Sequence, residues 1–224
     1  EALDVTVGDG ANTITGTAGD DTITTGSGAD TIVSYAGDDT IEAGDGVNTI
    51  TVTDGENDID GGEGVDTITA GNGNNTIDGG DGADVIVSGT GNNTFTNSAG
   101  NATITAGTGN NTVTNTAGSS TITLGNGTNT VNLTAGNSTV VTGSGADDIN
   151  ITAGNNDITA GAGNDTISLG SGNDTVDGGT GTDAVDFSIA RGTWAGTITD
   201  AETVTATYTG SATIDATGIA GYTT

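Results

Sequence analysis

Aspartates that could do chemistry recur along this chain at a fixed nine-residue interval. From Val7 to Asp186 the sequence divides into 20 nine-residue units without insertion or deletion, and the sixth position is Asp in nine of them. Carboxylates spaced in this way could bind a hard cation or, in pairs, serve glycoside hydrolysis. The nine are Asp21, Asp30, Asp39, Asp66, Asp84, Asp147, Asp165, Asp174 and Asp183.

The composition removes most other chemistry. The 224 residues include no Cys, His, Pro or Met, and one cation, Arg191, stands against 30 acidic residues, for a net charge of −29. Without His or Cys there is no soft-metal site, no thiol chemistry and no Ser-His-Asp triad. A single cation cannot neutralise nucleic-acid phosphates or bind an anionic membrane surface, and no apolar run is long enough to cross a membrane. The absence of Met also leads us to expect that Glu1 is not a translation start and that the chain is processed or excised.

The other positions of the unit indicate how the aspartates are held. The fourth position is Gly in all 20 units, the eighth is apolar in all 20 (14 Ile, five Val and Phe95), and the seventh is Thr in 15. A polar-apolar-polar triplet predicts a short strand with one side chain inward and two outward. Glycines at fixed offsets supply the positive-φ conformations of tight turns.

These elements predict an all-β parallel β-roll, a β-solenoid. Two turns and two strands close a coil in two units, and about ten coils stacked at roughly 4.8 Å would make a rod roughly 50 Å long. Two facing rows of Ile and Val would lie inside, with Thr ladders outside. The roll is predicted over 1–186, with Asp4–Thr6 as its initial strand.

The tail, 187–224, is predicted to be a non-repeat β-strand cap or docking surface. Residues 203–209 alternate polar and apolar side chains as a strand does. The tail also holds four of the six aromatic residues, namely Phe187, Trp194, Tyr208 and Tyr222.

The units resemble the calcium-binding repeats of RTX proteins, whose pattern G-G-x-G-x-D-x-U-x folds as a parallel β-roll. Gly61–Asp66, Gly79–Asp84 and Gly178–Asp183 match every defined position, and the resemblance covers about four fifths of the chain. It implies that Ca²⁺ lies between turns stacked on the same side, two units apart, held by sixth-position carboxylates and by turn carbonyls. Such an oxygen-only ligand set suits calcium, which takes six to eight oxygens.

The departures from the pattern select candidate calcium sites. Two turn glycines with stacked aspartates occur at Asp66/Asp84, Asp147/Asp165 and Asp165/Asp183, and these pairs are the main predicted sites. Further candidates are Asp30 with Asn48, Asn48 with Asp66, Asn156 with Asp174, and Asp21 with Asp39, whose turns carry Thr or Tyr in place of the second-position glycine. An isolated Asp could instead be a solvated turn residue.

Asparagines occupy the sixth position in the middle of one side of the roll. A neutral amide can lend its oxygen to calcium but adds no charge. Stacked amides are therefore predicted to form a side-chain hydrogen-bond ladder, with calcium confined to zones on either side. The five are Asn57, Asn75, Asn93, Asn111 and Asn129.

Apposed carboxylates and a thin core together predict a chain that is largely disordered without calcium and folds on binding it. Extracellular modules bind calcium at about 10⁻⁴–10⁻³ M, so we expect a protein that folds outside the cell. RTX proteins are likewise exported unfolded, which the resemblance implies. The predicted localisation is secreted, extracellular or cell-surface.

The first function hypothesis is a structural protein that self-assembles, head to tail, into a filament, surface layer or matrix, because unprotected strand edges recruit partners. The alternative is a calcium-dependent repeat block of a larger secreted adhesin, toxin or enzyme. A minor alternative is an ice-binding roll, which some RTX rolls resemble, through the patch Asn72/Asn74, Thr90/Asn92, Thr108/Asn110 and Asn126/Thr128. We expect no enzyme and no small-molecule substrate, since stacks on a convex rod make no cleft.

Overall fold

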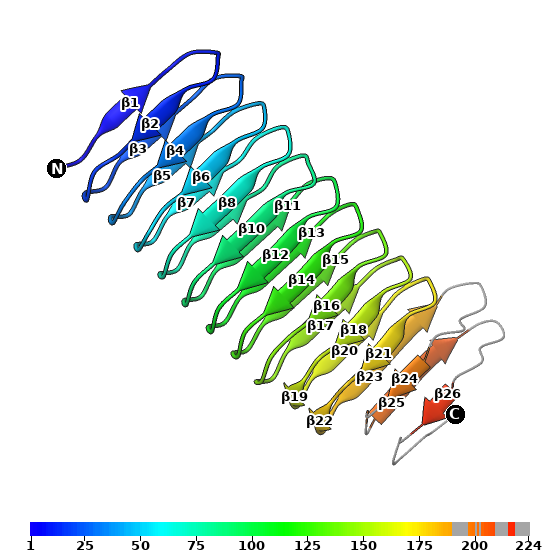
Figure 1. The fold of residues 1–224 in the computed structure, drawn as a ribbon. Coiled ribbons are helices and arrows are strands. Elements are labelled where there is room, and N and C mark those ends of the chain that lie inside the picture. The colour runs from blue at the N-terminus through cyan, green and yellow to red at the C-terminus, as the bar shows by residue number, and fades with distance from the viewer. Residues whose placement is uncertain (190–196, 200, 202, 209–214, 218–224) are drawn as a thin grey trace.

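The computed structural model describes residues 1–189, 197–199, 201, 203–208 and 215–217, and there the chain winds into one stack of coils (Figure 1). Two twelve-stranded parallel sheets face each other, and successive strands alternate between them. We call them sheet A and sheet B. The all-β parallel β-roll predicted from the repeat is confirmed.

Sheet A contains β1 (Asp4–Thr6), β3 (Thr22–Thr24), β5 (Thr40–Glu42), β7 (Asp58–Asp60), β9 (Thr76–Asp78), β11 (Thr94–Asn97), β13 (Thr112–Asn115), β15 (Thr130–Leu133), β17 (Asp148–Ile151), β20 (Thr166–Leu169), β23 (Ala184–Ile189) and β25 (Thr203–Tyr208). Sheet B contains β2 (Thr13–Thr15), β4 (Thr31–Val33), β6 (Thr49–Thr51), β8 (Thr67–Ala70), β10 (Val85–Ser88), β12 (Thr103–Ala106), β14 (Thr121–Leu124), β16 (Thr139–Val141), β18 (Asp157–Thr159), β21 (Thr175–Asp177), β24 (Thr197–Thr199) and β26 (Asp215–Thr217). A small third sheet pairs β19 (Ala162–Gly163) with β22 (Thr180–Gly181).

The register follows the repeat. Ile68 of β8 pairs with Ile86 of β10, two units later, so identical unit positions stack along the rod. The eighth-position side chains form the core, and the Ile residues among them are at most 1% exposed from Ile23 onward. The first position also points inward, which the triplet pattern did not predict: Val52, Leu124 and Leu133 are buried there.

Beyond the repeat, the chain continues in the same two sheets. β24 pairs with β21 (Val176↔Ile198) and β25 pairs with β23 (Val185↔Val204), both at intervals longer than the two units of the roll. The strand predicted over 203–209 is confirmed as β25. The predicted cap or docking role stays a prediction; Trp194 and Tyr222 lie outside the described residues, as do the side chains of Phe187 and Tyr208.

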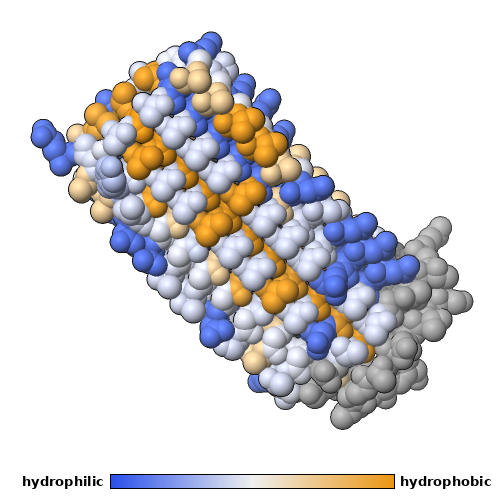
Figure 2. Space-filling view, in the orientation of Figure 1, coloured by the Kyte–Doolittle hydropathy of each residue, from blue (hydrophilic) through white to orange (hydrophobic). Residues whose placement is uncertain are grey.

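The outward faces of the two sheets differ in charge. The outward strand positions of sheet B carry no charged residue from Thr13 to Val141, only Thr and Val. Figure 2 shows this face, on which pale and orange side chains prevail. The corresponding positions of sheet A include Asp4, Glu42, Asp58, Asp60 and Asp78. The described residues contain no helix that could span a membrane.

Candidate calcium sites in the turns

Glycines shape the six-residue turns that hold the sixth-position side chains. Gly62 and Gly64 have φ of 89° and 136°, in the region that L side chains rarely adopt. A Cβ on Gly64 would also overlap the carbonyl oxygen of Gly46 in the preceding coil. At Gly64 the fourth-position glycine is therefore required both by its φ and by the close stacking of the turns.

The sixth-position side chains point inward. From Asp21 to Asp183 every one of them is at most 2% exposed. The alternative that these aspartates are solvated turn residues is therefore wrong, because the turn places each of these side chains inside the roll. A buried carboxylate needs hydrogen bonds or a cation to be tolerated.

The sixth-position residues on each side of the roll stack into a column. One hydrogen bond recurs along nearly all of both columns. The backbone N–H of a sixth-position residue donates to the Oδ1 of the sixth-position residue two units later, as Asp66 does to Asp84 at 2.9 Å and Asn75 to Asn93 at 3.0 Å. The same bond joins Asp147 to Asp165 at 2.8 Å. Asp and Asn thus hold one oxygen in the same place, and only their second terminal atom differs.

In the asparagines, that second atom is a donor facing carbonyl oxygens. Asn111 Nδ2 donates to Gly107 O at 3.3 Å, to Gly109 O at 2.9 Å and to Asn129 Oδ1 at 3.2 Å. Asn75 makes the equivalent three bonds. The predicted amide ladder is confirmed, since each amide from Asn57 to Asn129 donates to the next residue of the column.

In the aspartates, the second atom is an oxygen in a place where the asparagines hold a donor. This Oδ2 is buried and has no hydrogen-bond partner in Asp30, Asp66, Asp84, Asp147 and Asp165. At Asp66 the surroundings are oxygen-rich: a Cβ on Gly61 would lie 2.9 Å from Asp66 Oδ2 and 3.0 Å from Gly79 O. Buried oxygens gathered without donors are stabilised by a cation between them or by a proton on the carboxylate.

The donor set fits calcium. Among the described residues no three acidic side chains converge on one point, so backbone carbonyls would supply most of the six to eight oxygens that calcium takes. The asparagine turns show which carbonyls these would be, because Asn48 Nδ2 reaches Gly44 O at 3.1 Å and Gly61 O, in the next coil, at 3.3 Å. In an aspartate turn the equivalent carbonyls and the unpartnered Oδ2 would hold the ion.

Burial has an electrostatic consequence in these turns. It raises the pKa of Asp66 to about 6, with a smaller contribution from the charge of Asp84, and the pKa of Asp165 to about 6, with smaller contributions from Asp147 and Asp183. Burial also raises the pKa of Asp84. A bound divalent cation would reverse this trend by favouring the ionised form.

The other predicted residues differ in their surroundings. Burial raises the pKa of Asp21, but bonds from Thr17 N at 2.6 Å, Leu3 N at 2.7 Å, Thr17 Oγ1 and Ser34 Oγ outweigh it and lower the pKa below 3.8. Protein donors thus satisfy Asp21. For its partner Asp39, burial raises the pKa, although Asp21 N–H donates to its Oδ1 at 2.8 Å, and its Oδ2 is buried without a hydrogen-bond partner.

The amide partners in the mixed pairs act as donors. Asn48 uses its Nδ2 on turn carbonyls, and Asn156 donates its own to Asp174 Oδ1 at 2.9 Å. Asp165 N–H donates to Asp183 Oδ1 at 2.9 Å, which completes the stack of the third main pair.

The stacked aspartates fall in two zones. No charged residue occurs from 85 to 146, where the columns hold Asn, Ser and Ala. We call the coils up to Asp84 the first acidic zone and those from Asp147 the second. Between the two zones, asparagine amides donate hydrogen bonds to the turn carbonyls that a cation would bind in an aspartate turn.

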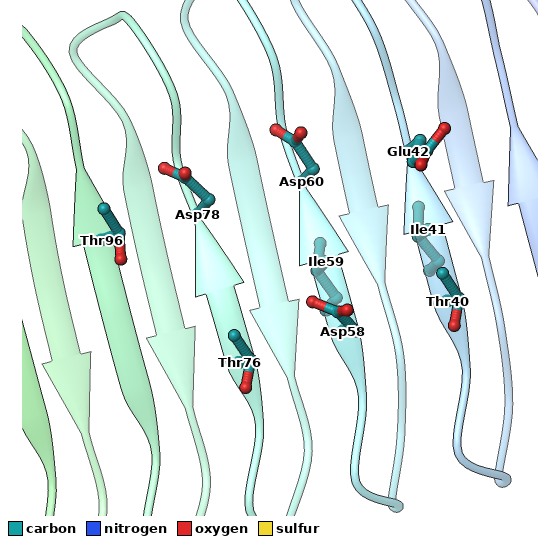
Figure 3. A pocket seen from close by; sticks show the side chains of 9 residues that line it. All are labelled: Thr40, Ile41, Glu42, Asp58, Ile59, Asp60, Thr76, Asp78 and Thr96. Atoms are coloured by element: carbon teal, nitrogen blue, oxygen red, sulfur yellow. The ribbon is translucent and has the colours of Figure 1, made fainter.

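Carboxylates also gather on the outer face of sheet A. Glu42, Asp60 and Asp78 line a shallow hollow over β5, β7 and β9 (Figure 3). Burial raises the pKa of Asp60, and Asp78 adds to the effect. Asp60 and Asp78 each accept a backbone N–H at 3.0 Å on Oδ1, from Gly62 and Gly80, and no oxygen of this cluster is both buried and unpartnered as Oδ2 is in the turns.

Comparison with known protein families matches the RTX calcium-binding nonapeptide repeat (4 copies) to residues 6–41, 33–68, 60–95, 96–114, 123–150 and 151–185. The chain belongs to this family. RTX repeats bind Ca²⁺ and are typical of secreted proteins, and the unpartnered oxygens of the turns agree with calcium binding. No match was found among curated proteins or among solved structures.

The position-one side chains were missed by reasoning from the sequence. Ser34, Asn97 and Asn115 are fully buried beside the sixth-position column. The sequence did contain a signal for them. Each is the first residue of a unit, and that unit lies two after the unit whose sixth-position side chain it lies beside, on the same side of the roll. Only the folded coil makes that interval a contact.

Proposed function

We propose that this chain is an extracellular structural rod whose acidic zones complete their folding on binding calcium and whose ends associate head to tail. The observation that carries the proposal is the buried Oδ2 of stacked aspartates, such as Asp66 and Asp165, which has no protein donor. In this RTX chain the asparagine turns provide the comparison, because the same place is filled there by an amide donor.

Calcium binding would add its free energy to folding in the acidic zones. Extracellular modules bind calcium at about 10⁻⁴–10⁻³ M, far above the free concentration inside a cell. The chain would therefore stay incompletely folded before export and fold after it. Circular dichroism with and without chelator tests this step: a full β spectrum and an unchanged melting temperature in excess chelator would contradict it.

Self-association is supported by the edges of the two sheets. Among the described strands, β1 pairs only with β3 and β2 only with β4, so each leaves one edge of backbone groups unpaired. Exposed edges of this kind accept a further strand, and a head-to-tail contact that repeats gives an open filament. The proposed products are a filament, a surface layer or a matrix.

Negative-stain microscopy in millimolar calcium tests the assembly. Long filaments or sheets that disappear on adding chelator are expected. Monodisperse short rods would contradict self-assembly and favour the alternative, a repeat block serving a larger secreted adhesin, toxin or enzyme. The calcium step would stand in that case, because the dichroism experiment measures it separately.

A further inference from the structure

The coil brings the side chain at position one of a unit against the sixth-position side chain of the unit two before it. Ser34 Oγ donates to Asp21 Oδ2 at 3.2 Å in this way. On the same side of the roll, Asn75 Nδ2 donates to Ser88 Oγ at 3.4 Å. In both pairs a donor meets an acceptor, so the second terminal atom of the sixth-position residue is satisfied.

Asp84 and Asn97 have the same separation in the chain, but two acceptors face each other. Both residues are 0% exposed, and neither Asp84 Oδ2 nor Asn97 Oδ1 has a hydrogen-bond partner. A Cβ on Gly79 would lie 3.0 Å from Asp84 Oδ2 and 3.3 Å from Asn97 Oδ1. The two oxygens therefore border the same small space.

The amide of Asn97 is held in this orientation by its nitrogen. Nδ2 donates to Asn115 Oδ1 at 3.1 Å and to Ala99 O at 3.4 Å. Asn115 in turn donates its own Nδ2 to Gly118 O at 3.3 Å. Turning the Asn97 amide over would place its oxygen against that of Asn115, so the described network keeps Oδ1 toward Asp84.

The next turn on this side cannot complete a site at Asp84, because its sixth position is Ala102. We propose that Asn97 Oδ1 takes the place of the missing second carboxylate, so that Asp84 and Asn97 bind the last calcium ion of the first acidic zone. The site rests on the proposed calcium function and adds a ligand from the end of a strand, β11, outside the six-residue turn. The Asp84/Asn97 site has one carboxylate instead of two. It is therefore occupied at a higher free calcium concentration than the Asp66/Asp84 site, since ligand charge tunes calcium affinity.

Three substitutions test the site by calcium titration calorimetry. N97A removes the oxygen and loses one ion or weakens one step by on the order of tenfold, while N97D adds a charge and tightens that step by on the order of tenfold. S88A is the matched control, because it removes a buried polar group at the same unit position next to neutral Asn75. It leaves the number of ions and their affinities unchanged.

A fourth variant gives a readout that needs no calcium. In D84N the new amide donates to Asn97 Oδ1, as Asn75 does to Ser88, so the melting temperature in chelator rises above that of the unmodified chain. Because Asp84 belongs to both the Asp66/Asp84 site and the Asp84/Asn97 site, the calcium steps of both sites are lost or weakened. A lower melting temperature in chelator would overturn the site.

The two proposals fail in different ways. If the unmodified chain binds calcium but N97A and N97D leave every step unchanged, Asn97 is a ladder residue that satisfies Asp84 through a reversed amide, and the inference is overturned alone. If the unmodified chain binds no calcium at all, the proposed function is overturned and this site with it.

Discussion

Replacing Asp165 by Asn tests whether the buried aspartates destabilise the calcium-free roll. Asp165 has one unpartnered oxygen and two stacked neighbours, Asp147 and Asp183. In D165N the new Nδ2 would face the carbonyls of its own turn and Asp183 Oδ1, as Asn129 Nδ2 faces Gly125 O at 3.2 Å and Asp147 Oδ1 at 2.9 Å. The variant copies an arrangement that the chain already contains.

The magnitude follows from the pKa of Asp165. Burial raises it from 3.8 to about 6, and about 1.4 kcal/mol per unit gives roughly 3 kcal/mol of destabilisation for the ionised, metal-free carboxylate at pH 7.5. Screening by solvent and salt reduces this to about 2 kcal/mol. For a chain of this length the melting temperature of D165N in chelator should therefore rise by about 4–8 °C.

The assay is thermal melting followed by circular dichroism at pH 7.5, in excess chelator and in millimolar calcium. D165N should melt higher than the unmodified chain in chelator and gain less from calcium. D157N is the control, since Asp157 is exposed at the start of β18 and its removal changes the net charge equally. A lower melting point of D165N in chelator, or an undiminished calcium effect, would refute the reasoning.

Three further predictions concern the same columns. N93D removes the donors to Gly91 O and Asn111 Oδ1 and should cost about 3–5 kcal/mol of unfolding free energy in chelator, recovered in part by calcium; equal losses in both buffers would contradict it. The pKa values of Asp66 and Asp165 are raised to about 6. In chelator their protonated forms therefore contribute stability that is present below pH 3.8 and lost as the pH rises through 6. Urea unfolding between pH 4 and 7 should show the unmodified chain losing more stability than D66N/D165N. G73A places a Cβ at φ of 129° against Gly55 O and should cost about 3 kcal/mol or more in calcium melts, whereas N74A, at an exposed neighbour, should change stability little.

The repeat predicted the fold because its period is a physical constraint. An apolar residue at the eighth position of every nine-residue unit, flanked mostly by Thr, is buried when each triplet forms a strand, and the glycines allow no long element between triplets. The amide ladder followed from the same stacking, since identical positions two units apart must lie in register, as Asn75 and Asn93 do.

The details of the sites could not be predicted in this way. The burial of the sixth position depends on the path of the turn, and the saturation of Asp21 depends on the backbone of Leu3 in a different coil. The pairing of Asp84 with Asn97 depends on contacts that no single unit contains. Beyond Asp186 the intervals from β21 to β24 and from β23 to β25 exceed two units, and strands continue in the two sheets without the repeat to indicate them.

The charge difference between the two sheet faces gives the rod a polarity across its width as well as along its length. A second rod that lay against the Thr and Val face of sheet B would meet no charge from Thr13 to Val141, whereas one against sheet A would meet Glu42, Asp58 and Asp60. For a chain of net charge −29, mutual repulsion therefore penalises a sideways approach over β5 and β7 of sheet A more than one over the Thr and Val face of sheet B. Two rods that met through this part of sheet B would turn the acidic strands of sheet A toward the surrounding water.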